Sequence, residues 1–418
     1  MKKPGASSAE RRAGKRLSGV VMLFYASAFL LLALRDNAWQ GYALAVGVPA
    51  MIWLGTNLLP HFFPADRLLL TLTNFLCALG ILVLYRTQPE LAYAQVIFYG
   101  IGIGAMALCT WAVRLLPFGR RMVTLLALVS LFLLALPLVA GTEKYGAKNW
   151  IYIGGVSFQP SELVKLSLLV VLASGLAARR FWSWLIFALA CLGLLMLQKD
   201  LGTALLYYAV TLLLAYAATG SWTLLLGGLG GSAGAAWLGY RMFSHVKRRV
   251  AVWQNPWADY ENAGYQMVQA LMALASGGLF GMGLGLGTPK AIPVFETDFI
   301  FSVICEQFGL IFGLCVLLIY VALVWRGATV AMAARRSFHG LLAMGATLMI
   351  GLQTFVIIGG VIKLIPLTGV TLPFISSGGS SMISGMCLTG LIQGVASRNE
   401  DALAEDADLA YMQGEVRE

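Results

Sequence analysis

Long apolar runs with few charges recur along nearly the whole sequence, and they limit the chain to folding within a lipid bilayer. A helix needs about 20 mainly apolar residues to cross the hydrocarbon layer, which is about 30 Å thick. The 418-residue chain is 59% hydrophobic and only 11% charged, far more apolar than soluble proteins. We therefore expect an all-α, polytopic membrane protein with about twelve transmembrane helices. The expected spans lie near residues 17–35, 38–60, 68–86, 92–115, 121–140, 162–178, 181–198, 201–219, 221–241, 299–325, 340–363 and 378–397.

Basic residues set the expected orientation, because lysine and arginine stay on the cytoplasmic side during insertion. A basic cluster within residues 1–16 places the N-terminus inside. Threading the helices from there also puts Arg120, Arg179 and Arg335 in cytoplasmic loops and returns the C-terminus to the cytoplasm. The loops expected outside are 141–161, 199–200, 242–298 and 364–377.

The chain is expected to divide into four parts. Residues 1–16 form a basic cytoplasmic N-terminus, and residues 17–140 form the first transmembrane helices. Residues 141–398 form a membrane core, in which 242–298 is a large extracytoplasmic loop. Residues 399–418 form an acidic cytoplasmic tail, which we expect to be unstructured because it is rich in charge.

Composition excludes several kinds of site. The net charge of +10 would suggest nucleic acid in a soluble protein, but the cations lie mostly in short loops between spans, so we expect no nucleic-acid partner. The six cysteines form no CxxC pair and the three histidines lie far apart, which argues against disulfides, a zinc site or a histidine relay. The glycines within 276–287 follow no strand and are not a dinucleotide fingerprint. Acid–base chemistry must therefore rest on carboxylates.

The loop 242–298 is too long to be a simple connection. Its first part, MFSHVKRRVAVW, spaces apolar residues as an interfacial helix does, with Lys247 and Arg248 on the opposite side, where lipid phosphates lie. Its second part, YQMVQALMALASGGLFGMGLG, is too short before its glycines to cross the membrane, so we expect a surface or re-entrant helix. Both features favour a functional loop.

Ionisable residues at helix ends are functional candidates, because charge is costly at membrane depth. Structural interpretations stand beside the functional ones. Glu162 and Lys165 could form a simple ion pair at the membrane surface. Asp200 could cap the helix that follows it, and Thr297 or Asp298 could cap the next one.

Asp298 is distinguished by its neighbours. Lys290 and the basic run 247–249 share its loop, so a carboxylate lies among cations where a lipid diphosphate would arrive. The later segment KLIPLTGVTLPFISSGGSS places prolines, glycines and hydroxyls before the last span, and its free amides could hold an anionic or sugar group. A helix cap with tight turns is the alternative interpretation of that segment.

Five segments, in their order and spacing, resemble the FtsW/RodA/SpoVE (SEDS) family of bacterial peptidoglycan glycosyltransferases. They are QPSELVKL at 159–166, QKDLGTALL at 198–206, GYQMVQALMALASGG at 264–278, TDFIF at 297–301 and PLTGVTLPFISSGGSS at 366–381. The resemblance covers about residues 148–398 and implies a ten-helix core, which leaves two additional helices near the N-terminus. It implies polymerisation of lipid II on the outer face of the bacterial cytoplasmic membrane, for division, elongation or sporulation.

The resemblance also implies residue roles and partners. Asp298 would be the catalytic base that deprotonates the acceptor hydroxyl in an inverting transfer. The implied partners are lipid II, membrane lipid and a class B penicillin-binding protein that supplies the transpeptidase. A divalent cation, Mg²⁺ or Mn²⁺, is implied at the diphosphate, with its ligands unknown and with no organic cofactor. The residues expected to bind substrate are Lys247, Arg248, Arg249, Lys290, Gln159, Ser161, Glu162, Lys165, Asp200, Gln266, Gln269, Thr297, Glu306, Lys363, Ser376, Ser377, Gly378, Gly379, Ser380 and Ser381.

Two other functions remain alternatives: a lipid II flippase or other transporter, and a non-catalytic scaffold for a cell-wall synthase. The ionisable candidates cluster on the expected outer side, which favours surface catalysis over alternating access. The sequence departs from the family pattern in the stretch IPVFETD and at Gln307, Lys363 and Ser377. These departures leave Asp298 in place.

Overall fold

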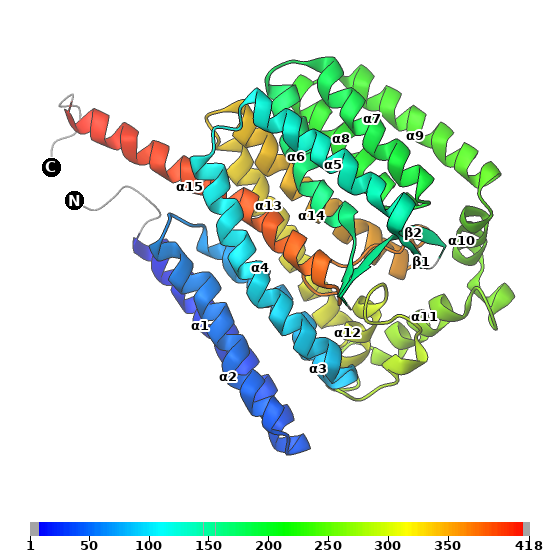
Figure 1. Cartoon of the computed structure of the whole chain (residues 1–418). Helices are drawn as coiled ribbons and strands as arrows, with labels where there is room; N and C mark the ends of the chain where they lie inside the picture. Colours follow the sequence, from blue (N-terminus) through cyan, green and yellow to red (C-terminus); the bar gives the residue numbers. More distant parts are fainter. Residues whose placement is uncertain (1–7, 145, 155, 413–418) are drawn as a thin grey trace.

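The computed structural model describes residues 8–144, 146–154 and 156–412, and it is a bundle of long helices (Figure 1). Part of the basic N-terminus and the last residues of the acidic tail lie outside this description. The α-helices are α1 Ser8–Asp36, α2 Trp39–Trp53, α3 Arg67–Thr87, α4 Pro89–Leu115, α5 Arg120–Ala140, α6 Pro160–Ala177, α7 Phe181–Leu197, α8 Leu201–Thr219, α9 Trp222–Met242, α10 Ser244–Gln254, α11 Tyr265–Gly277, α12 Ile300–Phe308, α13 Leu310–Met332, α14 Ser337–Val361 and α15 Gly379–Met412. A π-helical turn, Leu54–Leu58, and three 3-10 turns, Leu59–His61, Pro256–Asp259 and Pro289–Ala291, complete the helical structure described.

Nine of the described helices are long and apolar enough to cross a membrane, and they match nine of the expected spans. The other three expected spans are α7, which has 17 residues, and α9 and α15, which are rich in glycine and serine. The multi-pass membrane architecture is confirmed, whereas the exact number of twelve spans is not.

Small residues bring α15 against α4 in the interior of the bundle. A Cβ atom at Gly390 would lie 2.5 Å from the carbonyl oxygen of Met106, and one at Gly394 would lie 2.5 Å from Cβ of Val113. Glycine permits this close approach of two helices, as in other membrane proteins. At the edge of the bundle, α1 and α2 form a hairpin that packs beside α3 (Figure 1).

The bounds of the span expected at 299–325 are wrong, because the chain breaks there into α12 and α13, and only α13 is long enough to cross the membrane. Gly309 separates the two helices with a φ of +88°. A Cβ at this position would lie 2.2 Å from the carbonyl oxygen of Leu279. The glycine-rich loop after α11 therefore passes so close to the junction that only glycine fits, and the helix cannot continue.

A small antiparallel sheet in the expected outer loop 141–161 is an exception to the all-α prediction. Its strands are β1 Thr142–Lys144, β2 Ala147–Ile153 and β3 Val156–Phe158, in the order β1-β2-β3. Ile151 pairs with Phe158 in the register of the second hairpin. The sequence analysis did not identify these strands, because each is short.

The acidic tail is helical through Met412, so the expectation of an unstructured tail is wrong for residues 399–412. It continues α15 away from the bundle (Figure 1). Arg114 of α4 forms an ion pair with Asp401 at 2.9 Å, and Arg335 pairs with Asp406. These contacts hold the tail helix against basic residues at the helix ends.

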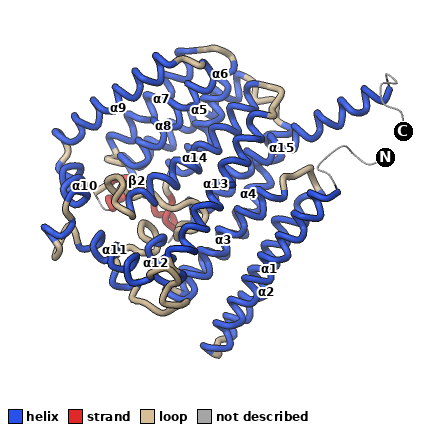
Figure 2. Tube along the Cα trace, turned by 180° about the vertical axis from the view of Figure 1, so that it is seen from behind, coloured by secondary structure: helices blue, strands red, loops and turns tan. Residues whose placement is uncertain are grey.

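The loop 242–298 contains the two helices that the sequence predicts, α10 and α11. Figure 2 shows α10, α11, α12 and the sheet together at the end of the bundle that lies away from both chain termini. This end holds the loops that the charge pattern assigns to the outside.

Candidate active site

A cavity of about 700 Å³ opens at this end of the bundle, and Asp298 lines it. Its walls come from α10, the turn before α11, the loop before α12 and the segment after α14. Segments far apart in the sequence thus meet around one carboxylate. The charged and polar side chains in the wall include Lys199, His245, Arg248, Arg249 and Gln266.

The backbone around Asp298 is fixed by the serine-rich segment that precedes α15. Ser376 Oγ donates a hydrogen bond to the carbonyl of Thr297 at 2.6 Å. The amide of Ser377 donates to the carbonyl of Glu296 at 2.9 Å. These two serines therefore position the backbone that carries the aspartate, which is a supporting role for residues expected to bind substrate.

Asp298 does not cap α12. Phe299 occupies the N-cap position, and no side chain of the described structure makes a capping hydrogen bond there. Thr297 donates from Oγ1 to the carbonyl of Val294 at 3.4 Å instead. The capping interpretation is wrong for both residues, and the carboxylate of Asp298 is left facing the cavity.

The surroundings of Asp298 suit a proton acceptor. Burial raises the pKa of its carboxyl from 3.8 to about 6, although the neighbouring Thr297 and the charge of Arg249 partly oppose the rise. Asp298 and Arg249 both border Gly369, where a Cβ would lie 3.6 Å from Asp298 Oδ2 and 3.6 Å from Arg249 Nη2. At pH 7 the group is largely ionised, yet it binds a proton more readily than an ordinary aspartate does.

One face of α10 supplies most of the positive charge in the cavity. His245, Arg248, Arg249 and Val252 line the wall at the spacing of a single helix face. Burial and the positive charges of Arg249 and Lys199 lower the pKa of His245, so its ring is neutral at pH 7. The permanent cations of the wall are therefore Arg248, Arg249 and Lys199.

Several predicted residues lie outside the cavity wall. Lys247 and Lys290 are exposed and do not line it. Gln266 does line it, whereas Gln269 donates from Nε2 to the hydroxyl of Tyr260 at 3.2 Å. Of the four predicted cations in this loop, only Arg248 and Arg249 therefore line the cavity.

The segment after α14 holds α10 in place. Trp253 Nε1 donates to the carbonyl of Lys363 at 3.1 Å, and Lys363 Nζ donates to the carbonyl of Gln254 at 3.4 Å. Arg249 Nη1 donates to the carbonyl of Thr368 at 2.9 Å. Lys363 therefore anchors the end of α10 and does not face the cavity itself.

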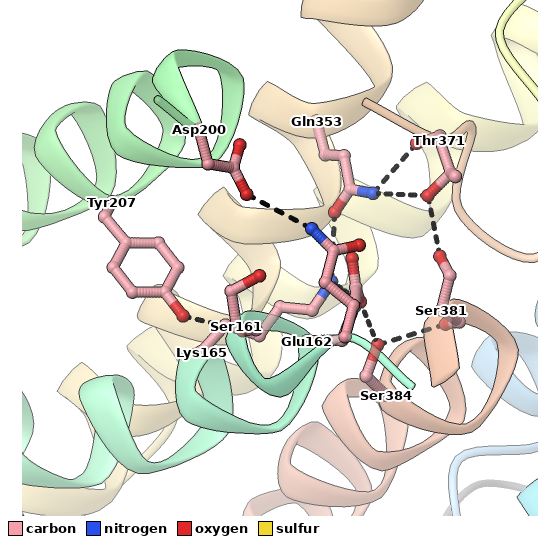
Figure 3. Close-up of polar contacts among 10 residues, drawn as sticks. Ser161, Glu162, Lys165, Asp200, Tyr207, Gln353, Thr371, Ser381 and Ser384 are labelled. Atoms are coloured by element: carbon pink, nitrogen blue, oxygen red, sulfur yellow. Dashed lines mark hydrogen bonds and ion pairs between the residues drawn. The ribbon is translucent and has the colours of Figure 1, made fainter. Parts of the chain in front are cut away.

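A second polar cluster lies inside the bundle, where α6, α14 and α15 meet (Figure 3). Lys165 Nζ lies 2.6 Å from Glu162 Oε2, and the two side chains are only 6% and 14% exposed. Ser384 Oγ donates to the same oxygen of Glu162 at 2.5 Å, and Lys165 Nζ donates to Gln353 Oε1 at 3.3 Å. The predicted ion pair is confirmed, and it is buried inside the protein.

Asp200 caps α8, as the structural interpretation predicts. Its Oδ1 accepts from the amide of Thr203 at 3.1 Å. Its Oδ2 accepts from Asn149 Nδ2 at 2.8 Å and from Gln159 Nε2 at 3.2 Å. Asp200 therefore ties the sheet and the start of α6 to α8.

Ser161 and Glu306 each carry a buried oxygen that has no hydrogen-bond partner among the residues described: Ser161 Oγ and Glu306 Oε2. The other oxygen of Glu306, Oε1, accepts from the amide of Thr288 at 3.0 Å. A Cβ at Gly287 would lie 2.7 Å from Glu306 Cδ. Glu306 thus holds the glycine-rich loop and does not line the cavity.

Residues 363–381, here termed the connecting segment, reach both clusters. Gly369 borders Asp298, as described above. Two residues later, the carbonyl of Thr371 accepts from Gln353 Nε2 at 2.8 Å, and the hydroxyl of Thr371 lies 2.7 Å from Ser381 Oγ (Figure 3). Because Gln353 also contacts Lys165, one stretch of backbone links the outer cavity to the buried ion pair.

Two of the amides expected to hold an anion before α15, those of Ser377 and Gly378, donate to other groups of the protein. The amide of Gly378 donates to Gln95 Oε1 at 3.3 Å. A Cβ at Gly379 would lie 2.6 Å from the ring of Phe98. These glycines, with the partly exposed Ser380 beside them, lie against α4 and outside the cavity wall.

Sequence reasoning missed part of the cavity wall. His245 could have been found from its spacing relative to Arg248 and Arg249 on one helix face. Glu261 and Asn262 also line the cavity from an irregular turn with no periodic signal, and Tyr265 lines it from the first position of α11. Their assignment requires the structure.

Comparisons with known proteins identify the family that the chain resembles. A family model described as cell cycle protein, FtsW/RodA/SpoVE, matches residues 66–401. The peptidoglycan glycosyltransferase RodA of Mycobacterium tuberculosis strain H37Rv is 34% identical over 367 residues, covering 78% of this chain and 77% of that protein. Stage V sporulation protein E of Bacillus subtilis is 32% identical over 366 residues, covering 79% of this chain and 96% of that protein.

Solved structures agree with the sequence relatives. The crystal structure of the rod shape determining protein RodA of Thermus thermophilus matches with a TM-score of 0.61 and 32% identity, over 81% of this chain and 98% of that one. A structure described as showing structural coordination of polymerization and crosslinking by a peptidoglycan synthase complex matches with a TM-score of 0.65 and 29% identity, over 81% and 98%. The chain belongs to the FtsW/RodA/SpoVE family.

Proposed function

We propose that this chain is a peptidoglycan glycosyltransferase that polymerises lipid II into glycan strands. The observation that carries the proposal is Asp298, a partly buried carboxyl with a pKa of about 6 in the wall of a cavity that also presents three permanent cations. The names of the curated relatives support the same reaction class.

The reaction assigns one task to each kind of group in the cavity. The carboxylate of Asp298 accepts the proton of the acceptor sugar hydroxyl, whose oxygen attacks the anomeric carbon of the donor as the bond to the diphosphate breaks. Arg248, Arg249 and Lys199 offset the negative charge that builds on the departing diphosphate. Because the leaving diphosphate is a stable anion, no separate acid is needed.

A divalent cation would enter as part of the substrate. Within the residues described, no three His, Cys, Asp or Glu side chains gather closely enough to hold a metal ion. Mg²⁺ or Mn²⁺ would instead be bound by the diphosphate of the substrate.

The proposed location is the bacterial cytoplasmic membrane, with the cavity on the outer side and both termini in the cytoplasm. The distribution of lysine and arginine in the loops supports this orientation. We also propose a class B penicillin-binding protein as a partner, because one solved relative is described as a peptidoglycan synthase complex that coordinates polymerization and crosslinking.

The test is polymerisation of labelled lipid II by the purified protein, with and without that partner. Asp298→Asn keeps the shape of the side chain but removes the base, so it should form almost no glycan. Glu143→Gln removes an exposed carboxylate of β1 and should leave strand formation unchanged. Equal strand formation by the wild type and Asp298→Asn would reject the base, and no strands from the wild type with its partner would reject the activity.

A further inference from the structure

The turn between α10 and α11 carries aromatic rings that the proposed reaction does not use. The rings of Trp257 and Tyr260 lie nearly parallel, with centroids 6.2 Å apart and 9° between their planes. Tyr265 meets Tyr260 edge-on at 5.9 Å. Trp257 is 58% exposed and Tyr260 is 39% exposed. These three residues, Trp257, Tyr260 and Tyr265, are termed the aromatic platform below.

The backbone beneath the aromatic platform is tightly folded. Asp259 accepts from Asn262 Nδ2 at 2.9 Å and from the amide of Ala263 at 3.1 Å. A Cβ at Gly264 would lie only 1.9 Å from the carbonyl oxygen of Pro256, so only glycine fits this turn. The backbone that carries the rings is therefore fixed before any ligand arrives, which lowers the entropic cost of binding.

The aromatic platform is continuous with the cavity that contains Asp298. Tyr265 lines the cavity itself, and so do Glu261 and Asn262 from the same turn. Tyr260 contacts the ring of Tyr265, and Trp257 in turn contacts Tyr260, so the two exposed rings continue from the cavity wall. A chain-like ligand that leaves the cavity on this side would pass over the rings.

The charges of the turn argue against insertion of the rings into the membrane. Asp259 and Glu261 flank Tyr260, and both are exposed. Anionic lipid headgroups repel such carboxylates, and burial of the rings would force their desolvation. A sugar chain fits this combination better, because a pyranose presents C–H groups to an aromatic face and hydroxyls to polar groups at its edge.

We propose that the aromatic platform is a binding subsite for the glycan strand, at the rim of the cavity and next to the reacting sugars. It stacks against sugar rings of the strand and keeps the strand bound between additions. The identity of the glycan rests on the proposed function, whereas the preference of the aromatic platform for sugar rings is tested separately.

Binding is measured with the Asp298→Asn protein in nanodiscs of phosphatidylethanolamine and phosphatidylglycerol, so that turnover cannot interfere. The probe is a soluble oligosaccharide of alternating N-acetylglucosamine and N-acetylmuramic acid. Trp257→Ala should weaken its binding about 3–10-fold, the size expected for one aromatic stacking contact. Trp257→Phe should keep most of the affinity and shows whether the turn still folds. Phe280→Ala, which removes an 82% exposed ring outside the aromatic platform, should change nothing.

Strand length provides the second measurement, with the catalytically intact protein and its partner. Trp257→Ala should release shorter strands, while the rate of the first coupling stays close to that of the wild type. Equal affinity and equal strand length in Trp257→Ala and the wild type would overturn the proposal while leaving the glycosyltransferase function intact. Weaker oligosaccharide binding in Trp257→Ala, together with no strand formation by the wild type and its partner, would support the subsite and reject the function. Quenching by brominated acyl chains that is present in the wild type and reduced in Trp257→Phe would identify Trp257 as a membrane anchor and overturn the subsite.

Discussion

The outer cavity and the buried cluster place their charges in different surroundings. In the cavity, the partly exposed Asp298 faces cations without a direct ion pair within the residues described, and burial raises its pKa. In the buried cluster, Glu162 and Lys165 lie 2.6 Å apart and have further hydrogen bonds from Ser384 and to Gln353. The difference indicates that the cavity keeps a group ready for chemistry, whereas the buried cluster uses its charges to fix the positions of helices.

The largest expected effect separates activity from stability at Asp298. Asp298→Asn should lower strand formation by about 10²–10⁴-fold, which is the usual contribution of a general base. The free energy of unfolding should stay the same or rise, because the variant no longer buries an ionisable carboxyl. Turnover of labelled lipid II and thermal unfolding in the same detergent measure the two quantities. Loss of both stability and activity in Asp298→Asn would show that Asp298, like the buried pair, has a structural role.

The buried pair should give the opposite result. Lys165→Met leaves Glu162 without its partner in a buried site and should lower the free energy of unfolding by about 3–5 kcal/mol. The double variant Glu162→Gln/Lys165→Met should recover most of that loss, because neither charge then remains unpaired. Chemical unfolding of the purified variants measures both changes. A single variant as stable as the wild type would show that the pair does not hold the helices.

The pH dependence should report the cavity alone. Because the pKa of Asp298 in the folded protein is raised to about 6, the group is protonated below that pH, and activity should fall about tenfold per pH unit there. The free energy of unfolding should change in the opposite direction and rise as the pH falls from about 6 toward 3.8. The cost of ionising this buried carboxyl is fully present above about pH 6 and is relieved over that interval. Arg249→Met removes a charge that lowers this pKa, so the acid limb of the activity profile should move to higher pH. An unchanged limb would mean that another group controls it.

The smallest expected effect concerns the residue between Asp298 and Arg249. Gly369 has a φ of +75°, while a Cβ there would make only ordinary contacts at 3.6 Å. Gly369→Ala should therefore cost about 1–2 kcal/mol from backbone strain, not from a clash. Unfolding measures the cost, and the pH profile shows whether the strain moves the carboxylate. Gly47→Ala, in a helix with open space around that position, is the matched control.

Much of the architecture follows from composition and periodicity. Apolar run length predicts the spans, and helical spacing predicts α10 with its cationic face. The break at Gly309 was missed because it depends on the loop backbone at Leu279, which lies far away in sequence and packs against the junction. Local patterns carry no information about such long-range contacts.

The site was also predictable only where local sequence determines it. The cations in the loop of Asp298 mark it as a candidate, and the cap formed by Asp200 follows from its place before a helix. The sequence does not show that Ser376 and Ser377 bind backbone carbonyls of the 296–297 stretch, because that requires two distant loops to be in contact. It also does not show that the pair of Glu162 and Lys165 is buried, since burial depends on α14 and α15.

The connecting segment has a consequence for how chains of this kind can vary. It reaches the outer carboxylate at Gly369 and the buried helices at Thr371 and Ser381, so its contour length sets the spacing between them. A side-chain replacement at a solvent-facing position of this stretch changes one contact. The insertion of a single residue between Gly369 and Ser381 would shift every later contact out of register. Related chains should therefore show freer variation of residue type than of residue number across this interval.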